Sequence, residues 1–214
     1  MDCCQCRGIE SLFDKKEAER KLHEYQRSGP ARSTRLLLNA LLGEGVRGAS
    51  LLDIGGGIGA IQHELAKSGV DHVTDVDASS AYLAAAQGEA ARQGYRERGE
   101  YIHGNFVELA PALPPAEIVT LDRVLCCYHD MPALVRGSVA KAERLYGLVY
   151  PRDGWWVRAG IAAINLSLKV QRNAFRVFAH PSAAVENIIR AHGFERRQHC
   201  TAGFWQVVLY ARSR

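Results

Sequence analysis

Short apolar runs alternate with segments of helical apolar spacing from about residue 50 onward. Each short run predicts a buried strand, and each helical segment predicts a helix packed beside it. The expected strands are 50–55, 72–77, 101–103, 117–121 and 148–150, and the expected helices are 59–67, 79–93 and 132–145. This alternation predicts a parallel sheet with helices on both faces and right-handed crossovers.

Both ends of the chain depart from this alternation. Ahead of the first strand, the spacing predicts helices at 14–26 and 33–42, the second capped by Ser33 or Thr34. After the fifth strand, we expect an inserted helix at 155–178, a helix at 181–192 and a closing hairpin of 194–200 and 204–211. The fold class is therefore predicted to be α/β, with seven strands and an antiparallel C-terminal hairpin.

The composition fits one globular domain. Of the 214 residues, 47% are hydrophobic and 23% are charged, so the chain can bury a sizeable core. We expect a single domain over 1–214, in which 1–45 form an N-terminal helical cap and about 155–180 form a lid over the site. The sequence carries no signal of the oligomeric state.

Charge and hydropathy narrow the classes of partner. The net charge of +4 comes from 27 basic and 23 acidic residues spread over the length, which gives no basic stripe for a nucleic acid. No apolar run approaches the ~20 residues of a membrane helix, and the first residues lack the plan of a signal peptide. We therefore expect no nucleic-acid partner, no membrane span and a cytoplasmic protein.

The six cysteines are expected to be reduced in that compartment. Three of them are interpreted as small apolar side chains, namely Cys126, Cys127 and Cys200. The other three, Cys3, Cys4 and Cys6, lie too close together to wrap a tetrahedral ion, and a fourth ligand would have to come from elsewhere. We therefore expect no metal site.

The most specific motif begins in the first expected strand. Residues 51–59 read Leu-Leu-Asp-Ile-Gly-Gly-Gly-Ile-Gly, an apolar strand that leads into a glycine turn and a helix. Glycine reaches positive φ and lets a ligand approach the backbone, while the helix offers unpaired N–H groups. The motif predicts a nucleotide site at Gly55, Gly56, Gly57 and Gly59.

Asp53 favours one class of nucleotide over another. Gly55, Gly57 and Ala60 also match the G-x-G-x-x-G/A spacing of a dinucleotide site. A carboxylate two residues before the first glycine would repel a pyrophosphate, but it suits a ligand with an ammonium and a sulfonium. The segment thus resembles the nucleotide loop of an S-adenosylmethionine (SAM) methyltransferase. As an alternative, Asp53 would only bond N–H groups of its own loop.

Two further motifs follow the second and third strands. Asp77, followed by Ala78, ends the second strand, where its carboxylate can accept both hydroxyls of a ribose. The alternative is a cap for the helix that begins at Ser79. Gly104-Asn105-Phe106 resembles the step at which methyltransferases meet adenine. In that resemblance Asn105 would bond the adenine and Phe106 would pack against its ring.

The fourth motif places Asp122 and Arg123 at the end of the fourth strand, where ligands bind in open α/β sheets. Residues 118–130 are similar to the fourth-strand segment of small-molecule class I methyltransferases, and residues 36–212 follow their order of motifs. The segment is not similar to the Pro-Pro-Tyr motif of amino-methylating DNA enzymes or to the Pro-Cys pair of cytosine-C5 enzymes.

By these motifs the chain is identified as a member of the class I SAM-dependent methyltransferases that act on small molecules. Its N-terminal helices and inserted helix give a distant resemblance to magnesium-protoporphyrin O-methyltransferases. The resemblance implies a Rossmann-like sheet, SAM as the cofactor, cofactor contacts at the residues named above, and a small-molecule methyl acceptor.

Methyl transfer from a sulfonium depends mainly on in-line positioning, so a general base is optional. His129 is the best-placed base, because its side chain titrates near neutrality, and Tyr128 and His180 follow. The alternative for His129 is a structural or merely exposed residue. Two other functions stay open: an NAD(P)-dependent oxidoreductase and a non-catalytic SAM-binding module.

Overall fold

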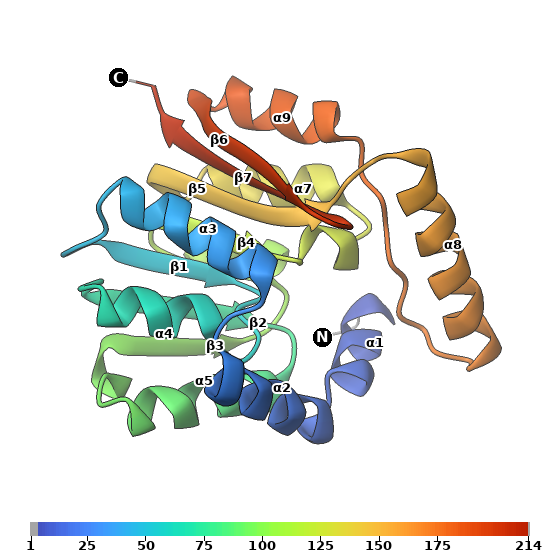
Figure 1. Cartoon of the computed structure of the whole chain (residues 1–214), viewed down its shortest axis with the longest axis horizontal. Helices are drawn as coiled ribbons and strands as arrows, with labels where there is room; N and C mark the ends of the chain where they lie inside the picture. The colour runs from blue at the N-terminus through green and yellow to red at the C-terminus, as the bar shows by residue number, and fades with distance from the viewer. Residues whose placement is uncertain (1–3, 214) are drawn as a thin grey trace.

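Seven strands form one sheet within residues 4–213, which the computed structural model describes (Figure 1). The strands are β1 (Ser50–Ile54), β2 (His72–Asp77), β3 (Gly99–His103), β4 (Ala116–Asp122), β5 (Ala142–Pro151), β6 (Phe194–Ala202) and β7 (Trp205–Arg212). The helices are α1 (Cys4–Leu12), α2 (Lys15–Ser28), α3 (Arg32–Gly43), α4 (Ala60–Lys67), α5 (Ser80–Arg92), α6 (Phe106–Leu109), α7 (Met131–Val139), α8 (Trp155–Val170) and α9 (Ser182–Ala191).

The strand order is β3-β2-β1-β4-β5-β7-β6. Strands β1 to β5 are parallel to their neighbours, and β7 lies antiparallel between β5 and β6. The predicted α/β class, with its mostly parallel sheet and antiparallel C-terminal hairpin, is confirmed. The order reverses between β1 and β4, and this position in an open α/β sheet leaves a crevice at the carboxyl ends of the strands.

Apolar clusters cover both faces of the sheet. On one face, α3 and α4 pack Leu37 and Leu65 against Leu51 of β1. On the other face, α7 and α9 pack against the cluster that contains Leu52. Side chains alternate along a strand, so Asp53 points to the same face as Leu51, under α4. The core therefore buries this carboxylate at the end of the central strand.

The fifth strand is longer than the sequence predicts. The helix expected at 132–145 is α7, which ends at Val139, and β5 begins at Ala142. Ala142 pairs with Ala116 of β4, so sheet pairing outweighs the helical spacing of the residues around it. The sequence also misses α1, a short helix that precedes the two expected at the N-terminus.

The start of α3 differs from the expectation. The helix begins after Ala31 and has no side-chain cap, so the predicted cap by Ser33 or Thr34 is wrong. The Thr34 hydroxyl instead donates a hydrogen bond to the Asp122 carboxylate at 2.5 Å. This bond ties α3 to the carboxyl end of β4.

The inserted helix α8 lies at one side of the molecule, beyond the carboxyl ends of the parallel strands (Figure 1). It ends at Val170, earlier than the predicted 178, because Arg172 adopts a left-handed φ of 55°. No helix in the described part of the chain is both long and apolar enough to cross a membrane.

Candidate active site

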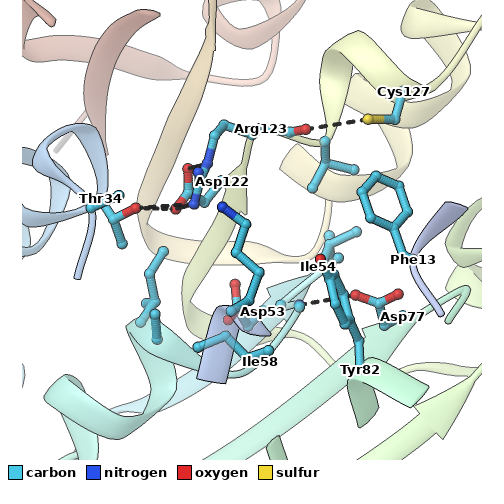
Figure 2. Close-up of a pocket in the computed structure, with 18 of the residues that line it drawn as sticks. Phe13, Thr34, Asp53, Ile54, Ile58, Asp77, Tyr82, Asp122, Arg123 and Cys127 are labelled. Carbon is cyan, nitrogen blue, oxygen red and sulfur yellow. Dashed lines mark hydrogen bonds and ion pairs between the residues drawn. The ribbon is translucent and has the colours of Figure 1, made fainter. Parts of the chain in front are cut away.

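A cavity of about 650 Å³ opens at the carboxyl ends of the central strands. Figure 2 shows Asp53 and Ile54 of β1, Asp77 of β2, Asp122 at the end of β4 and Arg123 just after it around this cavity. The size lies within the range of ligand pockets, ~300–1,000 Å³. The cavity therefore occupies the crevice that the strand order creates.

Most of the residues singled out from the sequence line this cavity. They are Asp53, Gly55, Gly56, Gly57, Asp77, Ala78, Asn105, Phe106, Asp122, Arg123 and Tyr128. Gly59 and His129, by contrast, are not among the lining residues. Gly59 is the N-cap of α4 with φ 81°, so it shapes the turn without facing the cavity.

The turn after β1 has the backbone that the glycine motif predicts. Gly55 and Gly57 have φ of 64° and 60°, in the left-handed region that other residues avoid. A Cβ on Gly55 would lie 2.5 Å from the Val124 side chain. A Cβ on Gly57 would meet nothing closer than Tyr82 at 3.5 Å, so only its backbone conformation demands glycine. The turn leaves a cradle in which a ligand can approach the main chain.

Asp53 is buried, with 1% of its surface exposed. Its carboxylate accepts hydrogen bonds from Thr120 Oγ1 at 2.7 Å and Gln62 Nε2 at 3.2 Å. Burial raises the pKa of Asp53 to about 7, and these two bonds oppose the rise. A cation in the cavity would favour the ionised form. The alternative role, in which Asp53 bonds N–H groups of its loop, is filled by Asp77.

Asp77 holds the turn and the next helix together. Its Oδ2 accepts from Gly57 N at 2.9 Å, and its Oδ1 accepts from Ser79 N at 2.8 Å. Ser79 caps α5 by accepting from Tyr82 N. Burial raises the pKa of Asp77, against these backbone bonds. Each carboxylate oxygen keeps a second acceptor position for a ligand hydroxyl.

Asn105 has a local role that the sequence did not reveal. Its Oδ1 caps α6 by accepting from Val107 N at 3.2 Å and also accepts from Tyr128 OH at 3.2 Å, while its Nδ2 donates to Glu108 at 2.8 Å. The predicted adenine contact by the Asn105 side chain would compete with these bonds. Phe106 is 5% exposed and belongs to the core cluster that includes residues of α7, so little of its surface is open to the cavity that it lines.

Arg123 is strained. It has a φ of 64° although it carries a side chain. Its Nε bonds Asp122 Oδ1 at 3.0 Å, while Thr34 bonds the other oxygen. The thiols of Cys126 and Cys127 donate to the Arg123 carbonyl at 3.2 and 3.4 Å. The Asp122 carboxylate raises the pKa of Arg123. Asp122 thus holds the guanidinium of Arg123 at the cavity wall, while the two thiols hold its backbone carbonyl (Figure 2).

The expected general base is not in the cavity. His129 is exposed and stacks on Tyr128, with ring centroids 5.4 Å apart. Tyr128 lines the cavity, whereas His129 does not. His180 is also structural: its Nε2 lies 3.0 Å from Leu125 O and 2.9 Å from Tyr128 O. Burial lowers the pKa of His180, which favours a neutral ring that donates to these carbonyls.

The sequence missed the residues that the N-terminal helices bring to the cavity. Phe13 packs on Tyr82 and Phe175, with centroids 5.4 and 5.8 Å apart, and Figure 2 shows Phe13 and Tyr82 near Asp77. For Tyr82, the local signal of a place at the cavity is its position early in the helix that follows Asp77. Nothing in the sequence pairs Phe13 with a site more than sixty residues away.

Among the described residues, no group of three or more His, Cys, Asp or Glu side chains could hold a metal ion. We expected no metal site at Cys3, Cys4 and Cys6. Cys3 lies outside the described residues, and the side chains of Cys4 and Cys6 lie outside the described side chains.

Residues 51–144 match a family model described as a methyltransferase domain. A search of curated protein sequences found no match. Magnesium protoporphyrin IX methyltransferase from Synechocystis PCC 6803, a structure with bound SAH, aligns over 98% of this chain and 100% of that chain, with a TM-score of 0.75 and 17% identity. An O-methyltransferase family protein from Burkholderia thailandensis aligns over 96% of this chain and 63% of that chain, with a TM-score of 0.71 and 16% identity.

An O-methyltransferase family 2 protein from Planctomyces limnophilus, in complex with apigenin, aligns over 87% of this chain and 63% of that chain, with a TM-score of 0.61 and 17% identity. At these identities the structural similarity establishes the fold, while the family model covers the segment from β1 to β5. Residues 51–144 thus match a methyltransferase domain, and the three solved structures share the fold of this chain.

Proposed function

We propose that this protein transfers the methyl group of SAM to an apolar small-molecule acceptor by in-line displacement. The observation that carries the proposal is that one cavity has both a polar and an apolar lining. The glycine turn and Asp77 form one part of the lining, and apolar side chains from α8 and the C-terminal hairpin form another. A polar cofactor and an apolar acceptor would thus share one space.

The residues around the glycine turn fit SAM. Gly55 and Gly57 open the backbone to the ligand, Asp77 keeps acceptor positions for ribose hydroxyls, and Asp53 supplies a carboxyl for a cationic ligand. Gly56, Ala78, Asn105, Phe106, Asp122 and Arg123 complete the proposed cofactor contacts. Bound SAM supplies an activated methyl group, and these residues would orient it.

The acceptor side of the cavity is apolar and aromatic. Its lining includes Ile164 of α8, Phe175, Val177, Phe204 and Trp205. Two proteins with the same fold are described with flat molecules: the Synechocystis enzyme is named for magnesium protoporphyrin IX, and the Planctomyces structure contains apigenin. These names and the aromatic lining support a planar, largely apolar acceptor for this chain as well.

The chain would promote transfer mainly by holding the two reactants in line and excluding water. Tyr128 is the polar residue best placed to orient the acceptor, because it lines the cavity and its hydroxyl is held by a hydrogen bond to Asn105. We assign it as a positioning residue. We expect α8 and the segment that follows it to act as the lid, because Ile164, Phe175 and Val177 cover one side of the cavity.

Ligand binding separates this proposal from its alternatives. SAM and S-adenosylhomocysteine should each raise the melting temperature, whereas NAD and NADP should not. A panel of planar phenols and carboxylic acids with methyl-labelled SAM should then yield a labelled product. Stabilisation by NAD alone would indicate an oxidoreductase, and SAM binding without turnover on any acceptor would leave a SAM-binding module.

A further inference from the structure

Helix α8 is apolar on two opposite faces. Its inner face buries Val157, Ile161 and Leu168. Its other side exposes large apolar side chains, with Trp155 82%, Leu166 64% and Val170 77% exposed. A helix that is apolar on both sides normally has a second apolar or interfacial environment. The inner face packs against the rest of the protein, so only the exposed apolar side lacks a partner within the described residues.

The exposed apolar residues form one continuous stripe. At ~100° per residue, they fall within an arc of about 100° on the side of α8 opposite the inner face. We call this the outer face, and it consists of Trp155, Ala159, Ala162, Ala163, Leu166 and Val170, all of them exposed. Figure 1 shows α8 at the periphery of the molecule, with no other element beyond it.

The charge around the outer face has one sign. Between Asp153 and Glu186 the sequence contains four basic residues and no acidic ones, which equals the net charge of +4 of the whole chain. Arg158 and Lys169 lie on α8 beside the stripe and are exposed, as is Arg172 just after it. Within residues 4–213 none of these three cations has an ion-pair partner.

We propose that the outer face of α8 binds the surface of an anionic lipid membrane. An apolar stripe that enters the interface, a tryptophan at its end and unpaired cations at its side are the features of helices that lie in the plane of a bilayer. The cations complement anionic headgroups, which attract each nearby basic residue by ~1 kcal/mol. The helix would lie between the bilayer and the cavity. Its outer face would contact the bilayer, and its inner face would contact the cavity and the rest of the protein.

A second copy of the chain fits the outer face less well. Two identical copies that met through this face would bring together two sets of the same unpaired cations, and the segment has no carboxylate to neutralise them. Charge therefore favours the anionic surface over self-association.

The test is sedimentation of the full-length protein with sucrose-loaded vesicles. Phosphatidylcholine vesicles with added phosphatidylglycerol should bind the protein at least tenfold more strongly than phosphatidylcholine alone, and added salt should weaken the binding. The double variant Trp155→Ser, Leu166→Ser and the double variant Arg158→Ala, Lys169→Ala should each reduce binding to the anionic vesicles at least tenfold. Leu42→Ser is the matched control, because Leu42 is 42% exposed on α3 and should have no effect.

Three outcomes would overturn the inference: no binding to anionic vesicles, binding that both double variants retain, or a dimer in light scattering that the Trp155 and Leu166 substitutions dissociate. Circular dichroism shows whether the variants fold. Stabilisation by SAM should persist in all of them, so a failure of membrane binding would leave the proposed transfer reaction untouched.

Discussion

Asp53 and Asp75 occupy paired positions on the neighbouring parallel strands β1 and β2. Both carboxyls are buried around Gly56: a Cβ on that glycine would lie 2.8 Å from Asp53 Oδ2 and 2.7 Å from Asp75 Oδ1. Within the described residues neither oxygen of Asp75 has a hydrogen-bond partner, and the same is true of Gln62 Oε1. Burial raises the pKa of Asp75 well above its usual value, and the charge of Asp53 adds to the rise.

This pair predicts that stability falls as pH rises. The folded protein holds a proton on these carboxyls that the unfolded chain releases above an ordinary aspartate pKa of ~3.9. The stabilising contribution is therefore complete below that pKa and is lost as pH rises through the folded values, about 7 for Asp53. Urea denaturation at pH 5 and pH 8 should give the lower free energy of unfolding at pH 8.

Asp75→Asn should stabilise the protein at pH 8 and change little at pH 5. The amide cannot ionise, and its NH₂ group can donate to an acceptor that lacks a partner, such as Gln62 Oε1. We expect a gain of about 1–2 kcal/mol at pH 8. SAM affinity should persist, because Asp75 does not line the cavity. A loss of stability at pH 8 would contradict a protonated carboxyl at this position.

Asp77→Ala should weaken SAM binding by more than tenfold in calorimetry. The substitution removes charge-assisted hydrogen bonds to the ribose, each worth ~1.5–3 kcal/mol. Ser79→Ala is the control, because it removes the cap of α5 and should cost ~1 kcal/mol of stability with an unchanged dissociation constant. An equal loss of affinity in both variants would reduce Asp77 to a support for the turn.

Gly57→Val should abolish SAM binding while most of the helix content remains. Valine resists the φ of 60° at this position and would occupy the open side of the turn. Circular dichroism measures the helix content, and thermal shift with SAM measures binding. Full SAM affinity in a folded Gly57→Val protein would show that the cofactor lies elsewhere.

His129→Ala should leave the rate of methyl transfer within about twofold, because this ring is exposed and lies outside the cavity lining. Tyr128→Phe should raise KM for the acceptor more than it lowers kcat, since the hydroxyl positions but does not transfer a proton. Steady-state kinetics of both variants test this division. A rate lowered 100-fold by His129→Ala would restore the histidine as the base.

Hydrogen exchange tests the lid. If α8 closes over the acceptor, its amides should exchange quickly in the free protein and markedly more slowly with cofactor and acceptor bound. Amides of β1 and β4 provide the internal reference for the sheet core. Exchange in α8 that is as slow as in the strands and insensitive to ligands would exclude a lid.

The sequence by itself determined the local chemistry and the order of the elements. The run from Leu51 to Gly59 specifies a strand, a positive-φ turn and a helix, because only glycine tolerates that backbone cheaply. Alternating apolar segments specify a parallel sheet, because each strand must bury both faces. These rules act within a few residues. The sequence alone therefore places Asp53 and Asp77 near the carboxyl ends of their strands and Gly57 in the turn that follows the first strand.

Tertiary structure alone decided which distant side chains meet. Asn105 caps α6 and accepts from Tyr128, Thr34 reaches Asp122 instead of capping α3, and His129 stacks outside the cavity. Each outcome depends on packing between elements far apart in the chain, and a polar side chain bonds whichever partner the fold brings within reach. The start of β5 at Ala142 also depends on a distant element, because pairing with β4 outweighs the local helical pattern.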